Sequence, residues 1–430
     1  MKILHYALGF PPYRSGGLTR YVMDVMQEQR RIGHNVAMLW PGVIGHMRNP
    51  RIREHHKING IYSFELQNPL PVVLDKTVRD PQNFHYAVNR SAYEIFLGKY
   101  RPDVIHIHTL QGLHAEFLEV ANALHIPTLF STHDFFGLYP MNEIFPLDHK
   151  LTDEECTVID QNGPKEKEIC FMQSAPVRWI KGSNAVRFLI RKGIKEVSQT
   201  DKERIDEVKP YSAFRKYEVG IINQVDRLLY NSSISKQAYE RYCTPKSSCI
   251  LHVTHAKLPD KRKQSRGNDG KIHVAFLGGD RPYKGLSFLL DAFQQLVKKD
   301  ERFHLDIFGL SVKGKDYISC YPSFSDFAQG MKDEDILVVP SVSFESFGFV
   351  VLESLAYGMP VIVSDCVGAK DLLPGRAIFH SGNVDNFQKQ ILQICDSSMD
   401  DFEVDLKDFN IANHVSALLN QYVDISKKKF

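Results

Sequence analysis

The sequence predicts an α/β protein made of two doubly wound domains in tandem, each a parallel sheet covered by helices. Two observations carry this prediction. Short apolar segments alternate with helical patterns in two successive series, and a polar, glycine-containing stretch at residues 261–271 lies between the series. Such alternation produces parallel strands joined by right-handed crossovers. The chain has 430 residues, which exceeds the usual capacity of a single hydrophobic core.

The first series begins close to the N-terminus and is interrupted once. Strands are predicted at residues 3–7, 35–40, 103–108, 126–131 and 226–231, and helices at 18–31, at 113–124 and after Ser232. Residues 137–210 hold loop-like, charged and helical segments without a strand pattern. We therefore expect an N-terminal domain over residues 1–258, with an irregular insertion at about 137–210.

The second series starts after the polar stretch. Strands are predicted at residues 272–277, 304–308, 336–339 and 361–364, and helices at 286–298, 325–331 and 349–357. An amphipathic pattern at residues 410–424 has no strand after it. The second domain is therefore expected over residues 259–405, and residues 406–430 are expected to form a helix that packs back on the N-terminal domain.

The composition argues against several classes of protein. The formal net charge of +2 is unlike that of nucleic-acid-binding proteins, which usually carry a strongly basic domain. The seven cysteines include no CxxC pair, which disfavours a zinc ribbon or a disulfide framework and favours a reducing cytosol. No apolar run reaches the roughly 18 residues of a transmembrane helix, and the short N-terminal run, which contains His5, is interpreted as a strand rather than a signal peptide. We expect a cytoplasmic protein.

Two glutamates, Glu345 and Glu353, flank an almost wholly apolar run that contains Gly348. The predicted strand at 336–339 precedes this segment, so Glu345 lies in the loop at the carboxyl end of a parallel strand. Ligands of doubly wound sheets bind at these carboxyl ends. The sequence therefore places a carboxylate pair at the expected ligand-binding edge of the second domain.

The helix that carries Glu353 is expected to begin at Ser346 or Phe347 and to end at Gly358. A helix amino end presents backbone N–H groups that attract an anion such as a phosphate. Carboxylates beside that anion would accept hydrogen bonds from neighbouring hydroxyls, which suits a sugar on one side and a ribose on the other. The N–H groups concerned belong to Phe347, Gly348, Phe349 and Val350.

This pattern resembles the Glu–seven residues–Glu motif of retaining glycosyltransferases with the GT-B fold, the large family-4-like group that includes mannosyl- and glucosyltransferases. Ser15–Gly17 resembles the glycine loop that follows the first strand in this family, and residues 103–108 (DVIHIH) and 131–135 (STHDF) resemble the next landmarks. Residues 276–293 (FLGGDRPYKGLSFLLDAF) resemble the phosphate-binding start of the second domain. The resemblance extends over most of the chain and implies two Rossmann-like domains with a cleft between them.

The resemblance also implies roles for individual residues. Glu345 would contact hydroxyls of the donor sugar, Glu353 would hold the ribose, and the backbone of residues 347–350 would cover sugar hydroxyls and the diphosphate. His133 would face the donor sugar across the cleft. Gly16 and Gly17 would let the backbone approach the donor closely.

Lys284 matches the lysine that neutralises the departing diphosphate in this family, because it follows Gly278 at the usual spacing. The sequence departs from the family pattern at one position. An arginine usually follows the first glycine, but Gly279 stands there and Arg281 comes two residues later. Two interpretations stay open: Arg281 reaches the phosphates from a shifted position, or that contact is lost.

Two further stretches each have two readings. His106, His108 and His133 admit a metal site, but no carboxylate pattern accompanies them, so we expect them to line the cleft or to pack at the end of the sheet, with no metal ligands in the chain. Residues 177–197 carry six Lys or Arg and one Glu, interleaved with apolar residues. This basic stretch suits either an anionic membrane surface or a basic surface helix packed through its apolar side.

We therefore expect a retaining, metal-independent hexosyltransferase without a cofactor. Its partners would be a nucleotide-diphosphate-sugar donor and a glycan or lipid-linked glycan acceptor, in the synthesis of a bacterial surface glycan or lipid-linked oligosaccharide. It would be cytoplasmic, with peripheral contact to the inner face of the membrane if residues 177–197 bind lipid. The alternatives are a non-catalytic glycosyltransferase-like binding subunit and a GT-B nucleotide-sugar epimerase or phosphorylase.

Overall fold

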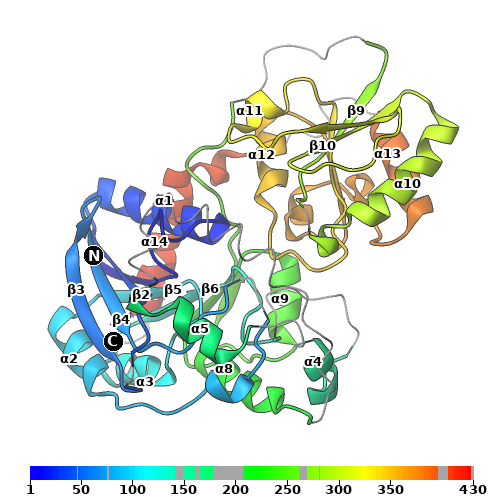
Figure 1. The fold of residues 1–430 in the computed structure, drawn as a ribbon. Helices are drawn as coiled ribbons and strands as arrows, with labels where there is room; N and C mark the ends of the chain where they lie inside the picture. Colours follow the sequence, from blue (N-terminus) through cyan, green and yellow to red (C-terminus); the bar gives the residue numbers. More distant parts are fainter. Residues whose placement is uncertain are drawn as a thin grey trace.

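The computed structural model describes residues 1–45, 47–74, 77–140, 149–159, 164–175, 177, 207–260, 269–279, 281–395 and 405–427. It contains two parallel-sheet domains with helices packed around them (Figure 1). The predicted α/β fold class is therefore confirmed. The basic stretch at residues 177–197 lies outside the described residues, apart from Val177.

The first domain is built on an eight-stranded sheet. Its strands are β1 (Lys2–Tyr6), β2 (Asn35–Pro41), β3 (Arg51–Ile58), β4 (Ile61–Gln67), β5 (Val104–Ile107), β6 (Thr128–Ser131), β7 (Arg227–Tyr230) and β8 (Ser248–Ile250). They lie in the order β3-β4-β2-β1-β5-β6-β7-β8. All neighbouring strands are parallel except β3 and β4, which are antiparallel.

The helices of the first domain are α1 (Gly17–Arg31), α2 (Ser91–Tyr100), α3 (Ala115–Ala123), α4 (Asp153–Ile159), α5 (Glu166–Met172), α8 (Tyr211–Ile222) and α9 (Ser233–Glu240), with a 3-10 turn η1 (Pro81–Asn83). The predicted helices at 18–31, at 113–124 and after Ser232 correspond to α1, α3 and α9. The described part of the expected insertion contains α4 and α5.

The second domain is built on a six-stranded parallel sheet in the order β11-β10-β9-β12-β13-β14. Its strands are β9 (Ile272–Phe276), β10 (Phe303–Phe308), β11 (Ile318–Tyr321), β12 (Ile336–Val339), β13 (Val361–Ser364) and β14 (Ile378–Phe379). Its helices are α10 (Leu286–Lys299), α11 (Phe327–Gly330), α12 (Phe349–Tyr357) and α13 (Val384–Cys395), with 3-10 turns η3 (Pro282–Lys284), η4 (Gly368–Leu372) and η5 (Gly375–Ala377).

The last helix, α14 (Ile411–Lys427), follows the 3-10 turn η7 (Lys407–Phe409) and packs beside α1 on the first domain (Figure 1). Its Tyr422 hydroxyl lies 2.7 Å from Nδ1 of His106 and accepts a hydrogen bond from Nε2 of Gln29 at 3.2 Å. Nε2 of His414 lies 2.9 Å from the hydroxyl of Tyr21. The helix thus closes a polar core that lies under the carboxyl ends of β1, β5 and β6.

The strands that the sequence prediction missed are β3, β4, β8, β11 and β14, and four of them are sheet edges. Edge strands bury little side-chain surface, so their sequences lack the continuous apolar run of a central parallel strand. In β3, RIREHHKI, the side chains are exposed or half-buried throughout. Apart from β4, the central strands occur where their apolar runs predicted them.

The two sheets meet through the loops that follow their carboxyl ends. Ser346, after β12, donates a hydrogen bond to the carbonyl of His133, after β6, at 2.6 Å. The hydroxyl and the backbone N–H of Ser233, after β7, both donate to Asp371, after β13. A buried apolar cluster that includes Tyr21, Phe347 and Phe409 continues across the same interface. Among the described residues, no helix is long and apolar enough to cross a bilayer.

Candidate active site

A cavity of about 140 Å³ opens at the carboxyl edge of the second sheet. The ends of β9 and β12 form its floor, and the turn η3 and the amino end of α12 form its walls. Its lining includes Gly278, Lys284, Ser341, Glu345, Gly348, Phe349 and Val350. The structure therefore brings Lys284, Glu345 and the expected helix amino end together at one cavity, as the resemblance implied.

Lys284 and Glu345 form an ion pair inside this cavity. Nζ of Lys284 lies 2.8 Å from Oε2 of Glu345, and the two side chains are 26% and 12% exposed. The hydroxyl of Ser341 donates a hydrogen bond to the other carboxylate oxygen, Oε1. Both oxygens of Glu345 are thus held by side chains of the second domain. The ammonium of Lys284 is fixed beside the place where an anion would meet the helix end.

The turn that carries Lys284 is held against the loop after β12. Gly285 has a left-handed backbone with φ of 78°, and a Cβ at this position would lie 1.8 Å from the carbonyl oxygen of Pro340. The backbone N–H of Val342 donates to the carbonyl of Tyr283 at 2.8 Å. Only glycine permits this contact, because the left-handed region disfavours other residues and no space remains for a side chain.

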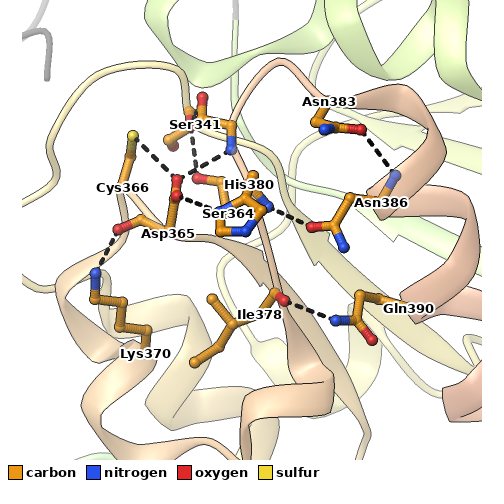
Figure 2. A network of polar contacts seen from close by, with 11 residues as sticks. Ser341, Ser364, Asp365, Cys366, Lys370, Ile378, His380, Asn383, Asn386 and Gln390 are labelled. Atoms are coloured by element: carbon orange, nitrogen blue, oxygen red, sulfur yellow. Dashed lines mark hydrogen bonds and ion pairs between the residues drawn. The ribbon is translucent and has the colours of Figure 1, made fainter.

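A network of polar contacts supports the loop from below (Figure 2). The carbonyl of Ser341 accepts hydrogen bonds from the hydroxyls of Ser364 at 2.6 Å and Ser381 at 3.3 Å. The carboxylate of Asp365 lies 3.0 Å from Nδ1 of His380 and accepts from the backbone N–H of Ser381 at 3.0 Å. The network ties the loops after β12, β13 and β14 into one unit, so the hydroxyl of Ser341 approaches Glu345 from a fixed position.

Helix α12 spans Phe349–Tyr357, so the helix predicted at residues 349–357 is confirmed, whereas the earlier start at Ser346 or Phe347 is wrong by two or three residues. The preceding residues have other backbone partners. Glu345 forms a parallel bridge with Val367, and the carbonyl of Phe347 accepts from the N–H of Ala369 at 2.7 Å. The helix end still faces the cavity, and its first N–H groups have no intrahelical acceptor.

Glu353 lies apart from the cavity lining and faces the first domain instead. Its Oε1 accepts a hydrogen bond from Nη1 of Arg20 at 3.2 Å and lies 3.1 Å from Nε2 of His255. Arg20 sits in the first turn of α1, and His255 is fully buried beside it. Sequence reasoning found neither partner, because Arg20 is 333 residues distant in the chain and carries no pattern that points to Glu353.

The glycine loop lies opposite this edge. Gly16 precedes α1, and Gly17 is its first residue. A Cβ on Gly17 would lie 3.1 Å from the ring of Phe349, so the amino ends of α1 and α12 meet at van der Waals distance. The structure thus brings the glycine loop to the cavity wall that Phe349 forms.

His133 sits at the same interface and is half-buried. Its ring packs 4.9 Å from that of Tyr21, and its Nε2 lies 3.3 Å from Nδ1 of His108. Burial, reinforced by His414, lowers the pKa of His133 to about 3. The imidazole is therefore neutral at physiological pH and available to donate or accept one hydrogen bond.

Two predicted donor-site residues lie outside the cavity lining. Arg281 is exposed and donates from Nη1 to the hydroxyl of Tyr283 at 2.6 Å. Phe347 is buried beside His252 and Phe349, in the apolar cluster that continues across the domain interface. The roles of Arg281 and of the Phe347 backbone in donor binding stay predictions.

Within the part of the chain that the structure describes, two side-chain clusters have the composition of a metal site. In the first, His5, His106 and His108 lie together, but the polar contacts of their ring nitrogens are already taken. His5 contacts His108 and Gln29, His106 contacts Tyr422 and Ser131, and His108 contacts His5 and His133. These histidines pack at the end of the sheet as a hydrogen-bonded core. The second cluster, His273, Asp306 and Glu334, lies outside the donor cavity.

Comparison with known proteins agrees with this geometry. Residues 258–408 match the family model for glycosyl transferases group 1, and residues 15–152 match the model for Glycosyltransferase Family 4. An uncharacterized glycosyltransferase of Methanocaldococcus jannaschii is 24% identical over 388 residues, which cover 87% of this chain and 83% of that protein. A phosphatidyl-myo-inositol mannosyltransferase of Mycobacterium leprae is 30% identical over 119 residues, which cover 25% of this chain and 32% of that enzyme.

The structure of Anabaena HepE in complex with UDP is similar over 100% of this chain and 98% of that chain, with a TM-score of 0.54 and 14% identity. A likeness at this identity establishes the fold. Together with the two family models, it confirms the family that the sequence motifs indicated. The chain is therefore a glycosyltransferase of the family-4-like group, with the GT-B fold.

Proposed function

We propose that the protein is a retaining hexosyltransferase that moves a hexose from a nucleotide-diphosphate-sugar to an acceptor hydroxyl. One observation carries the proposal: the ion pair of Lys284 and Glu345 and the amino end of α12 face the same cavity. Positive groups and a hydrogen-bonding carboxylate then lie side by side. Such a site suits a ligand that has both a diphosphate and sugar hydroxyls.

The positive groups would act on the leaving diphosphate. The ammonium of Lys284 and the free N–H groups of α12 would lie against its oxygens, where fixed charges and dipoles stabilise the negative charge that develops as the bond breaks. Glu345, held by Lys284 and Ser341, would accept hydrogen bonds from the hexose. A carboxylate in this ion pair is suited to positioning, so no covalent glycosyl–enzyme intermediate is required.

Retention of configuration would follow from attack on the leaving-group face. The acceptor oxygen bonds to the anomeric carbon as the bond from that carbon to the phosphate oxygen breaks, and the departing phosphate takes the acceptor proton. The acceptor would approach from the first domain, past Gly17 and the half-buried, neutral ring of His133. Closure of the two domains would exclude water and orient the reactants.

The comparisons support the classes of donor and acceptor. HepE is a structural neighbour that binds UDP, which supports a nucleotide-linked donor. The mycobacterial relative transfers mannose to phosphatidyl-myo-inositol, which supports a glycan or lipid-linked glycan acceptor of the kind used in bacterial surface glycan synthesis. The expected membrane contact through residues 177–197 belongs to this proposal and falls outside the described residues.

Thermal-shift screening with UDP-, GDP- and ADP-hexoses tests the donor first, and the stabilising donor is then incubated with glycan acceptors. We expect transfer that persists in EDTA, and NMR of the product should show the anomeric configuration of the donor. An inverted product would reject retention. Stabilisation by a donor without transfer or donor hydrolysis would instead support the non-catalytic subunit.

A further inference from the structure

His273, Asp306 and Glu334 form a compact polar cluster in the second sheet. They come from β9, from β10 and from the loop before β12, which are neighbours in the sheet order. Each offers one ligand atom, and these atoms lie within 4.8 Å of one another. Because His273 pairs with His304 and Asp306 lies two residues further along β10, both side chains project from the same face of the sheet.

Asp306 is the most deeply buried member of the cluster. Its side chain is fully buried, and Oδ2 lies 2.6 Å from Nδ1 of His273. Among the described residues, no hydrogen bond of normal geometry reaches Oδ1, although the Glu334 carboxyl and the Tyr321 hydroxyl interact with the Asp306 side chain. Nε2 of His304 lies 3.8 Å from Oδ1. A buried carboxylate oxygen without a close partner is costly, and a bound ion or water is one way to satisfy it.

A second carboxyl group lies beside Asp306. Glu334 is only 4% exposed, and burial together with the neighbouring Asp306 raises the pKa of its carboxyl to about 8. Asp335 is also buried and accepts a hydrogen bond from the backbone N–H of His273 at 2.8 Å. Three carboxyl groups thus lie close to His273.

The cluster has both an entry path and an outer partner for its histidine. His273 and Glu334 line a cavity of about 750 Å³, which shares no lining residue with the donor cavity. Water can therefore complete the coordination of a cation there. Nε2 of His273 lies 3.0 Å from a carboxylate oxygen of Asp269, so the other ring nitrogen is directed at Asp306. Metal-binding histidines usually have such a carboxylate behind them.

We propose that His273 Nδ1 and the carboxylates of Asp306 and Glu334 bind a divalent transition-metal cation at a site separate from the donor cavity. One imidazole nitrogen with two carboxylate oxygens suits Zn²⁺ and Co²⁺, whereas Mg²⁺ and Ca²⁺ prefer oxygen ligands alone. The ion would replace protons shared among these groups and would tie β9, β10 and the start of β12 together. It supports the fold of the second domain and takes no part in transfer.

The competing arrangement is a cluster without a metal, in which the imidazolium of His273 bridges Asp269 and Asp306. Burial alone would lower the pKa of His273, but the hydrogen bonds to these two carboxylates outweigh it and raise the pKa to about 9. The two arrangements predict opposite results in a metal-binding experiment. In the first, Co²⁺ displaces the proton between His273 and Asp306, and in the second the cluster excludes it.

The test is a titration of the full chain, stripped of metal with EDTA, with Co²⁺ at neutral pH. We expect visible d–d absorption that saturates at one equivalent, is abolished by Zn²⁺ and survives a large excess of Mg²⁺. Co²⁺ at about 100 times its dissociation constant should raise Tm by on the order of 5 °C. No absorption at one equivalent, or displacement by Mg²⁺ as readily as by Zn²⁺, overturns the proposal.

Matched variants locate the ion. Asp306→Asn and Glu334→Gln should weaken Co²⁺ binding by at least about 10-fold. Asp333→Asn removes the same charge from the next position, where the side chain is 77% exposed, and should bind Co²⁺ as the wild type does. Equal losses in all three variants would overturn the assignment. If Asp306→Asn does not fold, Glu334→Gln alone decides. Failure of this test leaves donor transfer intact, so the two proposals are distinguishable.

Discussion

Glu345 and Glu353 stand eight positions apart, yet the two carboxylates have differently built surroundings. Both partners of Glu345, Lys284 and Ser341, belong to the second domain. Both contacts of Glu353, to Arg20 and His255, come from the first domain. The comparison teaches that one carboxylate is positioned within a single domain, whereas the position of the other depends on how the two domains meet.

The largest loss of activity is expected from substitutions at the Lys284–Glu345 pair, which lies within the second domain. Lys284→Ala and Glu345→Gln should each reduce kcat/KM for transfer about 10²- to 10³-fold, because each removes a group that would stabilise charge or orient the sugar in the transition state. Steady-state kinetics with the best donor measure the loss. Lys298→Ala, at the opposite end of α10, is the control and should keep activity within about twofold. Full activity in both site variants would contradict the proposed site.

The packing beneath Lys284 is tested by two glycines with left-handed backbones. Gly285→Ala should lower the free energy of unfolding by about 3 kcal/mol, because backbone strain and the collision with Pro340 add. Gly279→Ala, at φ of 64° with no atom within 4 Å of its Cβ, carries only the strain and should cost about 1 kcal/mol. Urea unfolding measures the free energy of unfolding of both variants. Equal decreases would show that the Pro340 loop moves to make room for the added methyl group.

The stability of the first domain should fall more strongly at acid pH than that of the second domain. Burial lowers the pKa of His5 and His414 to about 4 and that of His133 to about 3, and it also lowers the pKa of His106 and His108. The pKa values in the folded state lie below the unfolded value of about 6.5. The contribution of these histidines to the free energy of unfolding is therefore fully present above about pH 6.5 and is lost as the pH falls toward 4. Each histidine contributes about 1.4 kcal/mol per pH unit in this window. Urea midpoints at pH 7.5 and 5.5 measure the loss, and an unchanged midpoint would mean that these rings are not buried.

The smallest effect is expected at the contact between domains. Arg20 is 41% exposed, so Arg20→Ala should raise KM for the donor only about 3- to 5-fold and leave kcat nearly unchanged, with a smaller change at high salt. Arg31→Ala breaks an ion pair within the same helix α1 and should have no effect on KM. A 100-fold fall in kcat for Arg20→Ala would instead place this residue in the transfer step.

How far the sequence predicts the fold depends on where an element lies. Central parallel strands such as β9 and β12 are buried on both faces, so their apolar runs were visible in the sequence. β3, β8, β11 and β14 lie at sheet edges, where β3 is mostly polar and the other three are too short to give that signal. Periodicity placed α12 at residues 349–357, as observed, but the start inferred at Ser346 or Phe347 was too early, because the backbone of residues 345–347 pairs with residues 366–369.

The candidate site divides in the same way. Motif spacing found Lys284, Glu345 and the helix end, because strand ends and helix amino ends are local features. Arg20 and His255 reach Glu353 only through the arrangement of the two domains, so their sequences carry no sign of it. Spacing left two readings of Arg281 open, and in the structure its guanidinium contacts the ring and hydroxyl of Tyr283 two positions later.

The return of α14 to the first domain has a mechanical consequence. The chain leaves the first lobe after β8 and re-enters it through η7, so two covalent crossings join the lobes rather than one. A single tether would let the lobes swivel freely, whereas two tethers restrict their relative movement to bending about the line that joins them. Opening and closing of the second domain should therefore be a hinge motion with one dominant axis, which passes through the two chain crossings.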